Sequence, residues 1–203
     1  MRTIKTKVYK FSELSDEAKE KAVERWNQDG PFEGWWEFVE EDAKNIGALM
    51  GITVDKLYFS GFWSQGDGAC FEGSYEYVKG GAKAVKDETG GTDKDLLAIA
   101  YGLQDVQRRN FYALSASVKQ SGHYCHEFCT QIDVADNRDN APWQVSDETE
   151  EAIKDLLRDF MRWIYRNLEK EYEYQTSFEA VAETIEANEY EFTEAGKMIY
   201  CRA

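Results

Sequence analysis

The chain has 203 residues, of which 42% are hydrophobic and 14% aromatic, enough for a folded core; this composition excludes a disordered protein. Its net charge of −15 excludes nucleic-acid binding through a generic basic face, which needs lysine and arginine, and disfavours binding to anionic membranes. No run reaches the roughly 18 apolar residues of a membrane helix, and the first residues lack the apolar region of a secretory signal, so we expect a cytoplasmic protein.

The first predicted elements are a strand and two helices. Residues 3–11 alternate between apolar and polar side chains, which is typical of a strand with one wet face. Ser15 is a candidate N-cap, because acidic residues follow it where the helix dipole favours them. A second helix is predicted over 34–50, where large apolar residues recur at helical spacing. Its predicted buried residues include Trp35, Val39 and Ile46, whereas Trp36 and Phe38 lie outside that face, where an exposed aromatic indicates a contact surface.

Acidic residues are concentrated in these two helices. Between Glu13 and Asp42, eleven acidic residues stand against three basic ones. The segment has two interpretations, a solvated face that keeps the protein soluble or a surface that binds a basic protein, including one that normally binds nucleic acid. The glutamates assigned to such a surface are Glu17, Glu20, Glu24, Glu37, Glu40 and Glu41.

The stretch FSGFWSQGDGACFEGSY predicts a β-hairpin. Strands are expected over 57–63 and 69–77, with a turn at 64–68 whose glycines adopt positive φ and whose aspartate hydrogen-bonds nearby backbone. The stretch lacks the lysine and the following helix of a phosphate loop, and a calcium loop needs more oxygen ligands. The alternative to a structural turn is a small polar pocket that includes Asp67 and Glu72.

A helix over 92–109, with Thr92 as its candidate cap, leads into a second predicted hairpin with strands over 111–119 and 127–134. The helix ends in Arg108 and Arg109, where the helix dipole favours basic residues. The same two arginines are also candidates for binding an anion.

The segment HYCHEFC holds both histidines and two of the four cysteines of the chain. Zinc uses these ligand types, but on a strand His123 and Cys125 would face one side and His126 the other. A nucleophilic cysteine–histidine pair would lack a group that orients the base. We therefore expect free cysteines, no metal and no cofactor.

The remaining elements are a long helix over 146–174, a last helix capped by Ser177, and a short strand pair near the end. Leu156, Phe160 and Ile164 are predicted to be buried on the long helix. The order of elements predicts a single α+β domain over 1–203, with an antiparallel sheet of four to five strands packed with several helices. The polar segment 136–145 is a possible boundary.

Five segments carry a resemblance to a known family, namely VYKFSELSDEAKEKA, FSGFWSQGDGACFEGSY, QRRNFY, WIYRNLEKEYEY and ANEYEFTEAG. In them the chain resembles uncharacterised proteins of tailed bacteriophages and prophages, some of which are labelled antitoxin of a toxin–antitoxin system. The resemblance implies expression in the cytoplasm of a bacterial host and a role against host machinery or host defence. It brings no established catalytic or binding residues.

The leading hypothesis is a non-enzymatic protein that binds and neutralises a host-defence, host-machinery or toxin protein with a basic surface, without contacting nucleic acid or membrane directly. The alternative is a small-ligand protein, either a nucleotide-binding protein or a hydrolase, that uses the 64–72 turn and the second hairpin. Its candidate residues are Asp67, Glu72, Arg108, Arg109, His123 and His126. The alternative requires that these six residues converge in one pocket.

Overall fold

The computed structural model describes residues 7–28, 33–138 and 145–199, which form an α+β fold as predicted. The chain divides into two compact units. One consists of Glu37–Glu169, and the other combines the two terminal segments, Met1–Trp36 and Lys170–Ala203.

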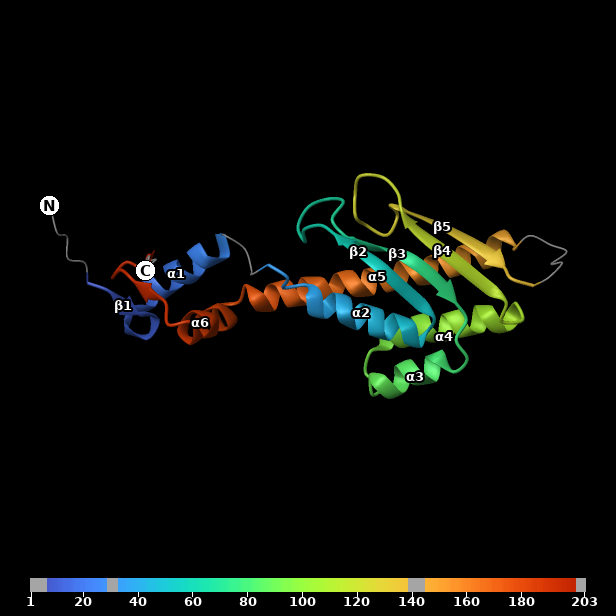
Figure 1. Cartoon of the computed structure of the whole chain (residues 1–203), viewed down its shortest axis with the longest axis horizontal. Coiled ribbons are helices and arrows are strands. Elements are labelled where there is room, and N and C mark those ends of the chain that lie inside the picture. Colours follow the sequence, from blue (N-terminus) through green and yellow to red (C-terminus); the bar gives the residue numbers. More distant parts are fainter. Residues whose placement is uncertain (1–6, 29–32, 139–144, 200–203) are drawn as a thin grey trace. The chain divides into compact units, whose positions relative to one another are not determined.

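The Glu37–Glu169 unit contains an antiparallel four-stranded sheet in the order β2-β3-β4-β5, which confirms the predicted antiparallel arrangement (Figure 1). Its strands are β2 (Ile52–Phe59), β3 (Ala69–Glu76), β4 (Leu114–Gln120) and β5 (Thr130–Asp136). Two hairpins, β2–β3 and β4–β5, therefore make up the sheet, and β3 pairs with β4 between them.

The strand register separates a buried face of the sheet from a polar one. Tyr75 pairs with Ile52 on one side and Ala116 on the other, and all three side chains are buried. The next residue pair, Ser74 and Ser117, points to the opposite face and stays partly exposed. This alternation is typical of an antiparallel sheet with one face against a core and the other against water.

Helices pack against the buried face of this sheet. They are α2 (Glu37–Leu49), α4 (Lys94–Arg109) and the larger part of α5 (Asp147–Gln175), and α3 (Gly81–Glu88) packs against α2 and α4. The fully buried Phe160 of α5 lies at the centre of this packing, with its ring centroid 6.0 Å from that of Phe71 on β3 and 5.6 Å from that of Trp163. A Cβ atom on Gly47 of α2 would lie 2.8 Å from the Ile52 carbonyl oxygen and 3.4 Å from the Phe160 ring, so the missing side chain lets α2 lie close to the start of β2 beside this ring.

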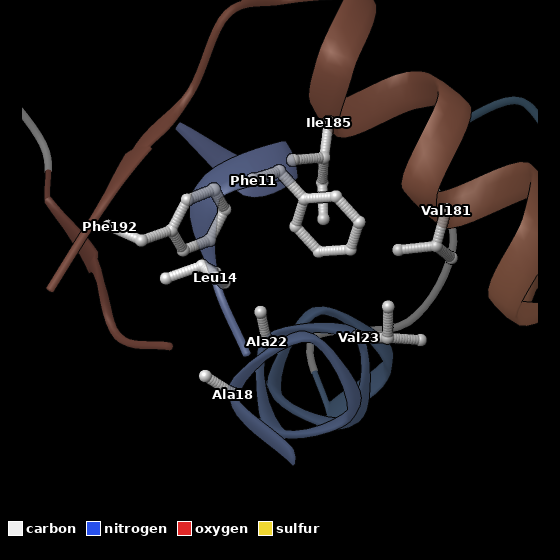
Figure 2. Close-up of a cluster of buried hydrophobic side chains, with 8 residues drawn as sticks. All are labelled: Phe11, Leu14, Ala18, Ala22, Val23, Val181, Ile185 and Phe192. Carbon is white, nitrogen blue, oxygen red and sulfur yellow. The ribbon is translucent and has the colours of Figure 1, made fainter. Parts of the chain in front are cut away.

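The unit made of the two terminal segments has its own small core. Its elements are β1 (Tyr9–Lys10), the short helix η1 (Phe11–Glu13), α1 (Asp16–Gln28), α6 (Phe178–Ala187), β6 (Glu191–Phe192) and β7 (Met198–Ile199). The strands form a sheet in the order β1-β6-β7. Figure 2 shows its buried cluster, which consists of Phe11, Leu14, Ala18, Ala22, Val23, Val181, Ile185 and Phe192. Both ends of the chain contribute to this core.

The strands begin and end at places that differ from the predicted ones. β2 starts at Ile52, five residues before the predicted 57–63, and ends at Phe59. The second hairpin starts later than predicted on both strands, because a turn occupies 110–113 and a loop occupies 121–129. The predicted strand over 3–11 is reduced to Tyr9–Lys10 among the described residues, since 1–6 lie outside them.

The predicted helices are confirmed, with one cap reassigned. Ser15 accepts a hydrogen bond from the Ala18 backbone N–H at 3.3 Å, and Ser177 accepts one from Ala180 at 3.2 Å. The cap of α4 is Asp93 rather than Thr92, because the Asp93 carboxylate accepts the Leu96 backbone N–H at 2.9 Å. The carboxylate is the stronger acceptor for a helix N-terminus.

Four of the six residues singled out as buried are so. Trp35, Val39, Phe160 and Ile164 are buried, whereas the prediction is wrong for Ile46 and Leu156, which are half-buried. The neighbour of Leu156, Leu157, is fully buried together with Phe160 and Ile164, so the core face of α5 lies where it was expected and Leu156 lies at its edge. The possible boundary at 136–145 falls largely on 139–144, which lie outside the described residues.

Candidate functional site

Two loops lie side by side at one end of the sheet (Figure 1). They are the β2–β3 loop, residues 60–68, and the β4–β5 loop, residues 121–129. A Cβ atom on Gly68 would lie 2.5 Å from the Cβ of His126, and one on Gly66 would lie 3.5 Å from the Tyr124 ring. The glycines of the first loop therefore allow the second loop to pack directly against its backbone.

The carboxylate of Asp67 stabilises the first loop. Its Oδ2 accepts the backbone N–H groups of Trp63 at 3.1 Å and Ser64 at 2.7 Å. An aspartate that bonds to nearby backbone in this way is a common turn device. The arrangement supports the structural interpretation of the turn, because this oxygen is engaged by the loop itself.

The first loop is anchored on α5. The Tyr165 hydroxyl donates to the Gly61 carbonyl at 2.9 Å, and the Tyr165 ring stacks on Phe62 at 5.5 Å. Burial raises the pKa of Tyr165, and the nearby carboxylates of Asp67 and Glu169 raise it further. The tyrosine thus stays protonated and keeps its hydroxyl available as a donor.

The second loop carries the histidines and two cysteines, which corrects their predicted placement on a strand. His126 Nδ1 accepts the Phe128 backbone N–H at 3.1 Å. A neutral ring that accepts at Nδ1 carries its hydrogen on Nε2, which lies 3.6 Å from Cys129 Sγ. The imidazole therefore bridges the backbone and a thiol inside the loop.

The second loop is also anchored on α5. The guanidinium groups of Arg158 and Arg162 lie 5.1 Å and 5.5 Å from the centroid of the Phe128 ring, within the range of cation–π attraction. Arg162 Nε also donates to Glu127 at 2.8 Å. Both loops are therefore fixed to one rigid helix.

The six residues of the alternative ligand site do not all meet. Asp67, His123 and His126 belong to the two loops, and Glu72 lies on β3, where it accepts the Tyr58 hydroxyl at 3.0 Å. Arg108 and Arg109 end α4, and the chain then enters β4 at the end opposite the 121–129 loop (Figure 1). Each arginine pairs with Asp105, at 2.5 Å and 2.6 Å respectively.

The cysteines near the loops show no metal arrangement. Within the described residues, no group of three or more histidine, cysteine, aspartate or glutamate side chains is placed to hold a metal ion. Cys70, Cys125 and Cys129 are free thiols, and Cys70 is fully buried. The described residues therefore offer no support for the zinc interpretation.

The buried thiol predicts a loss of stability at alkaline pH. Burial, and then the nearby Cys125 and Cys129, raises the pKa of Cys70 from 9.0 to about 12. Because the unfolded chain releases this proton first, the free energy of unfolding should be unaffected below pH 9 and should fall as the pH rises from 9 toward 12. Urea unfolding of Cys70→Ala should show a shallower decline than the parent protein between pH 9 and 10.5. An identical decline in both proteins would contradict the assignment of this pH dependence to Cys70.

Tyr75→Phe is the matched control. The pKa of Tyr75 is raised from 10.0 to about 12, so its contribution to the loss of stability begins at a higher pH than that of Cys70.

The predicted acidic surface is divided between the two units. Glu17, Glu20 and Glu24 are exposed on α1 in the terminal unit, on the face opposite Ala18 and Ala22. Lys21 hydrogen-bonds Glu17 at 2.6 Å and thereby lowers the pKa of Glu17. These three glutamates form one charged stripe because they are spaced three and four residues apart.

The second acidic group lies on α2 of the sheet-bearing unit. Glu37 and Glu41 are exposed, and the half-buried Glu40 pairs with Lys44 at 2.6 Å. Phe38 lies in the same first turn and is 74% exposed, as its position outside the buried face predicted. An exposed phenyl ring thus lies among the carboxylates.

Sequence reasoning did not single out the exposed aromatic side chains of the two loops. Trp63, Tyr124 and Phe128 are 75%, 58% and 61% exposed. The available signal for Trp63 was its position in a loop that contains several glycines, since loops on a rigid scaffold often carry binding residues.

Residues 35–178 match a family described as "Domain of unknown function (DUF8835)". No curated protein and no solved structure matches the chain. The matched range contains the whole Glu37–Glu169 unit and excludes α1. Among the described helices, none combines the length and the apolar composition needed to cross a bilayer.

Proposed function

The chain belongs to the DUF8835 family, a domain of unknown function, and from that starting point we propose that it is a non-enzymatic protein that binds and neutralises a protein partner through its acidic helices. The observation that carries the proposal is Phe38, 74% exposed on α2 between Glu37 and Glu41. Aromatic side chains ringed by polar groups are typical centres of protein interfaces.

The partner is a protein with a basic surface. The net charge of −15 attracts such a protein over long range and accelerates its encounter with the acidic helices. The resemblance to phage and prophage proteins points to a host-defence, host-machinery or toxin protein inside a bacterium. A protein that normally binds nucleic acid is the version of this partner that best fits an acidic surface.

The small-ligand alternative draws less support from the same geometry. The Asp67 carboxylate bonds to the backbone of its own loop, and Arg108 and Arg109 pair with Asp105 near the other end of the sheet. A nucleotide site would need a cation and a polar pocket in one place.

Phe38→Ala should weaken partner binding at least about tenfold, as expected for an interface hot spot. The experiment is affinity capture from bacterial lysate with tagged protein, identification of the partner, and surface plasmon resonance with the purified pair. Thermal stability should change little, because the ring is 74% exposed. The matched control is Phe128→Ala, a phenyl ring that is 61% exposed on the second loop. Equal affinities for Phe38→Ala and the parent protein would refute the assignment of α2.

Association should slow markedly between low salt and roughly 0.5 M, because salt shortens the Debye length, about 8 Å at physiological ionic strength. Reversing Glu17, Glu20 and Glu24 to lysine should reproduce part of this loss in the on-rate while leaving stability nearly unchanged, since exposed charges contribute little to folding. Reversing Glu37 and Glu41 should also raise the off-rate. A triple α1 variant that associates as fast as the parent protein would show that these glutamates serve solubility only.

A further inference from the structure

The turn between α4 and β4 holds two bulky residues in an unfavourable backbone conformation. Phe111 has φ +58° and Tyr112 has φ +60°. The left-handed region is disfavoured by the Cβ atom and is ordinarily occupied by glycine or asparagine. Among the described residues, the only other non-glycine residue with positive φ is Glu189, which stands alone after α6.

The strained turn is a common helix C-terminal motif, but phenylalanine occupies the position that usually holds glycine. Asn110 is the C-cap of α4, and the Tyr112 backbone N–H donates to the Gln107 carbonyl at 2.7 Å. In this motif the residue after the cap, here Phe111, is usually glycine. A phenylalanine there indicates that its side chain has a use that outweighs the strain.

A fully buried amide keeps the turn closed. Gln107 is 0% exposed, and its Nε2 donates to the Leu114 carbonyl at 2.7 Å while its Oε1 accepts the Leu114 N–H at 3.2 Å. The buried Gln107 side chain therefore joins the last turn of α4, before the strained residues, to the first residue of β4, after them. This bracing is what lets a strained conformation persist.

The aromatic rings of the two strained residues are exposed to solvent and not buried in the core. Phe111 is 74% exposed and Tyr112 is 46% exposed. The Tyr112 ring lies 4.6 Å from that of Tyr77, and the guanidinium of Arg138 lies 5.0 Å from the Phe111 ring. The rings are thus supported from the side while their outer surfaces face solvent.

Three arginine side chains lie near these rings. Arg108 and Arg109 share the single carboxylate of Asp105, so two guanidinium groups lie beside one acid. Arg138 adds a third guanidinium group, paired with Asp136. A guanidinium fork matches the geometry of a carboxylate, and two of these groups share one acid here.

We propose that the 110–113 turn is a second contact surface, on which Phe111 and Tyr112 bind an aromatic or apolar side chain of an acidic protein segment and Arg108 and Arg109 bind its carboxylates. Aromatic and arginine side chains dominate the binding energy of protein interfaces. A single-stranded nucleic acid also stacks on aromatic rings, but it carries a negative charge at every residue, so the net charge of −15 repels it more strongly than a peptide in which acidic residues alternate with aromatic ones. The partner proposed for this turn has a charge opposite to that of the partner proposed for the acidic helices.

The test replaces the strained residues with glycine and measures stability and binding together. Phe111→Gly and Tyr112→Gly should each raise the melting temperature by roughly 2–4 °C, because glycine accepts positive φ without strain. The same variants should weaken binding of a fluorescein-labelled peptide EWEEWE at least about tenfold in fluorescence anisotropy. A gain in stability with a loss of binding is a combination that a merely structural aromatic would not give.

Two matched controls make the result specific. Glu189→Gly relieves the same kind of strain at φ +53° in the terminal unit, so it should raise the melting temperature and leave EWEEWE binding unchanged. Phe38→Ala should also leave EWEEWE binding unchanged, so failure of this proposal is distinguishable from failure of the proposed function.

Three outcomes would overturn the proposal. One is unchanged EWEEWE binding in Phe111→Gly and Tyr112→Gly, whatever their stability. Another is a lower melting temperature in both variants, which would show that the rings support the fold. The third is that the charge-reversed peptide KWKKWK or the oligonucleotide dT12 binds at the turn more tightly than EWEEWE, which would assign the surface to a basic protein or to nucleic acid.

Discussion

Phe160→Ala should lower the free energy of unfolding by about 3–5 kcal/mol, the range found when a fully buried phenylalanine is truncated. The residue is 0% exposed and contacts Phe71 of β3 and Trp163 of α5. Its ring also lies next to Gly47 of α2, so the cavity would open where the sheet and two helices meet. The surroundings cannot collapse into this space without moving a regular element, which places the expected loss at the upper end of the range.

Urea denaturation followed by tryptophan fluorescence and by circular dichroism measures this loss. Leu156→Ala is the matched control, because Leu156 lies on the same helix but is only half-buried. Its truncation should cost about 1–2 kcal/mol, less than that of Phe160, since part of its surface already faces solvent. If the two variants lost equal stability, the assignment of the core face of α5 would be incorrect.

Gly51→Ala should be at least as damaging, with an expected loss above about 4 kcal/mol or no soluble protein at all. Gly51 joins α2 to β2 with φ +87°, and a Cβ atom there would lie 1.7 Å from the Glu76 carbonyl oxygen. The Glu76 backbone N–H also donates to the Gly51 carbonyl at 2.9 Å, so these two segments cannot separate without losing a hydrogen bond. The collision involves backbone on both sides, and no side chain can rotate to relieve it.

The matched control for this variant is Gly80→Ala. Gly80 has φ +84°, almost the same backbone conformation, but nothing lies within 4 Å of the added Cβ atom. The control therefore carries the conformational cost alone, about 1–2 kcal/mol. The difference between the two variants in melting temperature and soluble yield isolates the steric effect at Gly51. Similar behaviour of both variants would show that the backbone at Gly51 moves more easily than the structure indicates.

Patterns of local side chains predicted the helices well. Ser15 and Ser177 cap their helices as expected, because an N-cap depends on a few adjacent residues. The periodicity of α5 also predicted its length and its core face, except that Leu157 is fully buried whereas Leu156 lies at the edge of that face. Adjacent leucines satisfy the same helical period, and the packing of neighbouring elements decides which one is buried.

The strand ends could not be predicted from alternation alone. The segment from Phe111 alternates like the rest of β4, yet its first residues form the strained turn because buried Gln107 binds the Leu114 backbone on both atoms. Similarly, the aromatic residues after Phe59 continue a strand-like pattern, but the backbone N–H groups of Trp63 and Ser64 donate to the Asp67 carboxylate and form a loop instead. In both cases a side chain outside the strand overrides the alternation along it.

Only those features of the candidate surfaces that depend on local periodicity were predicted from the sequence. The acidic residues and the outward position of Phe38 follow from helical periodicity, which the sequence displays directly. The packing of His126 against Gly68 depends on two hairpins meeting in space, and so does the separation of Arg109 from both loops. Such long-range placement is carried by the tertiary fold and not by any single segment.

The terminal unit combines the first and the last segments of the chain, so it can complete its fold only after the other unit has been synthesised. Phe11 packs against Phe192 with a ring separation of 5.9 Å, yet the whole Glu37–Glu169 unit is synthesised between them. The sheet-bearing unit can therefore fold while the ribosome is still adding residues, because all its strands come from contiguous chain. Until α6 and β6 emerge, the apolar face of α1 lacks its native partners Val181, Ile185 and Phe192 and is open to chaperones and proteases. Ribosome stalling or premature termination before Val181 would thus release a product with a completed sheet and an unprotected N-terminal helix.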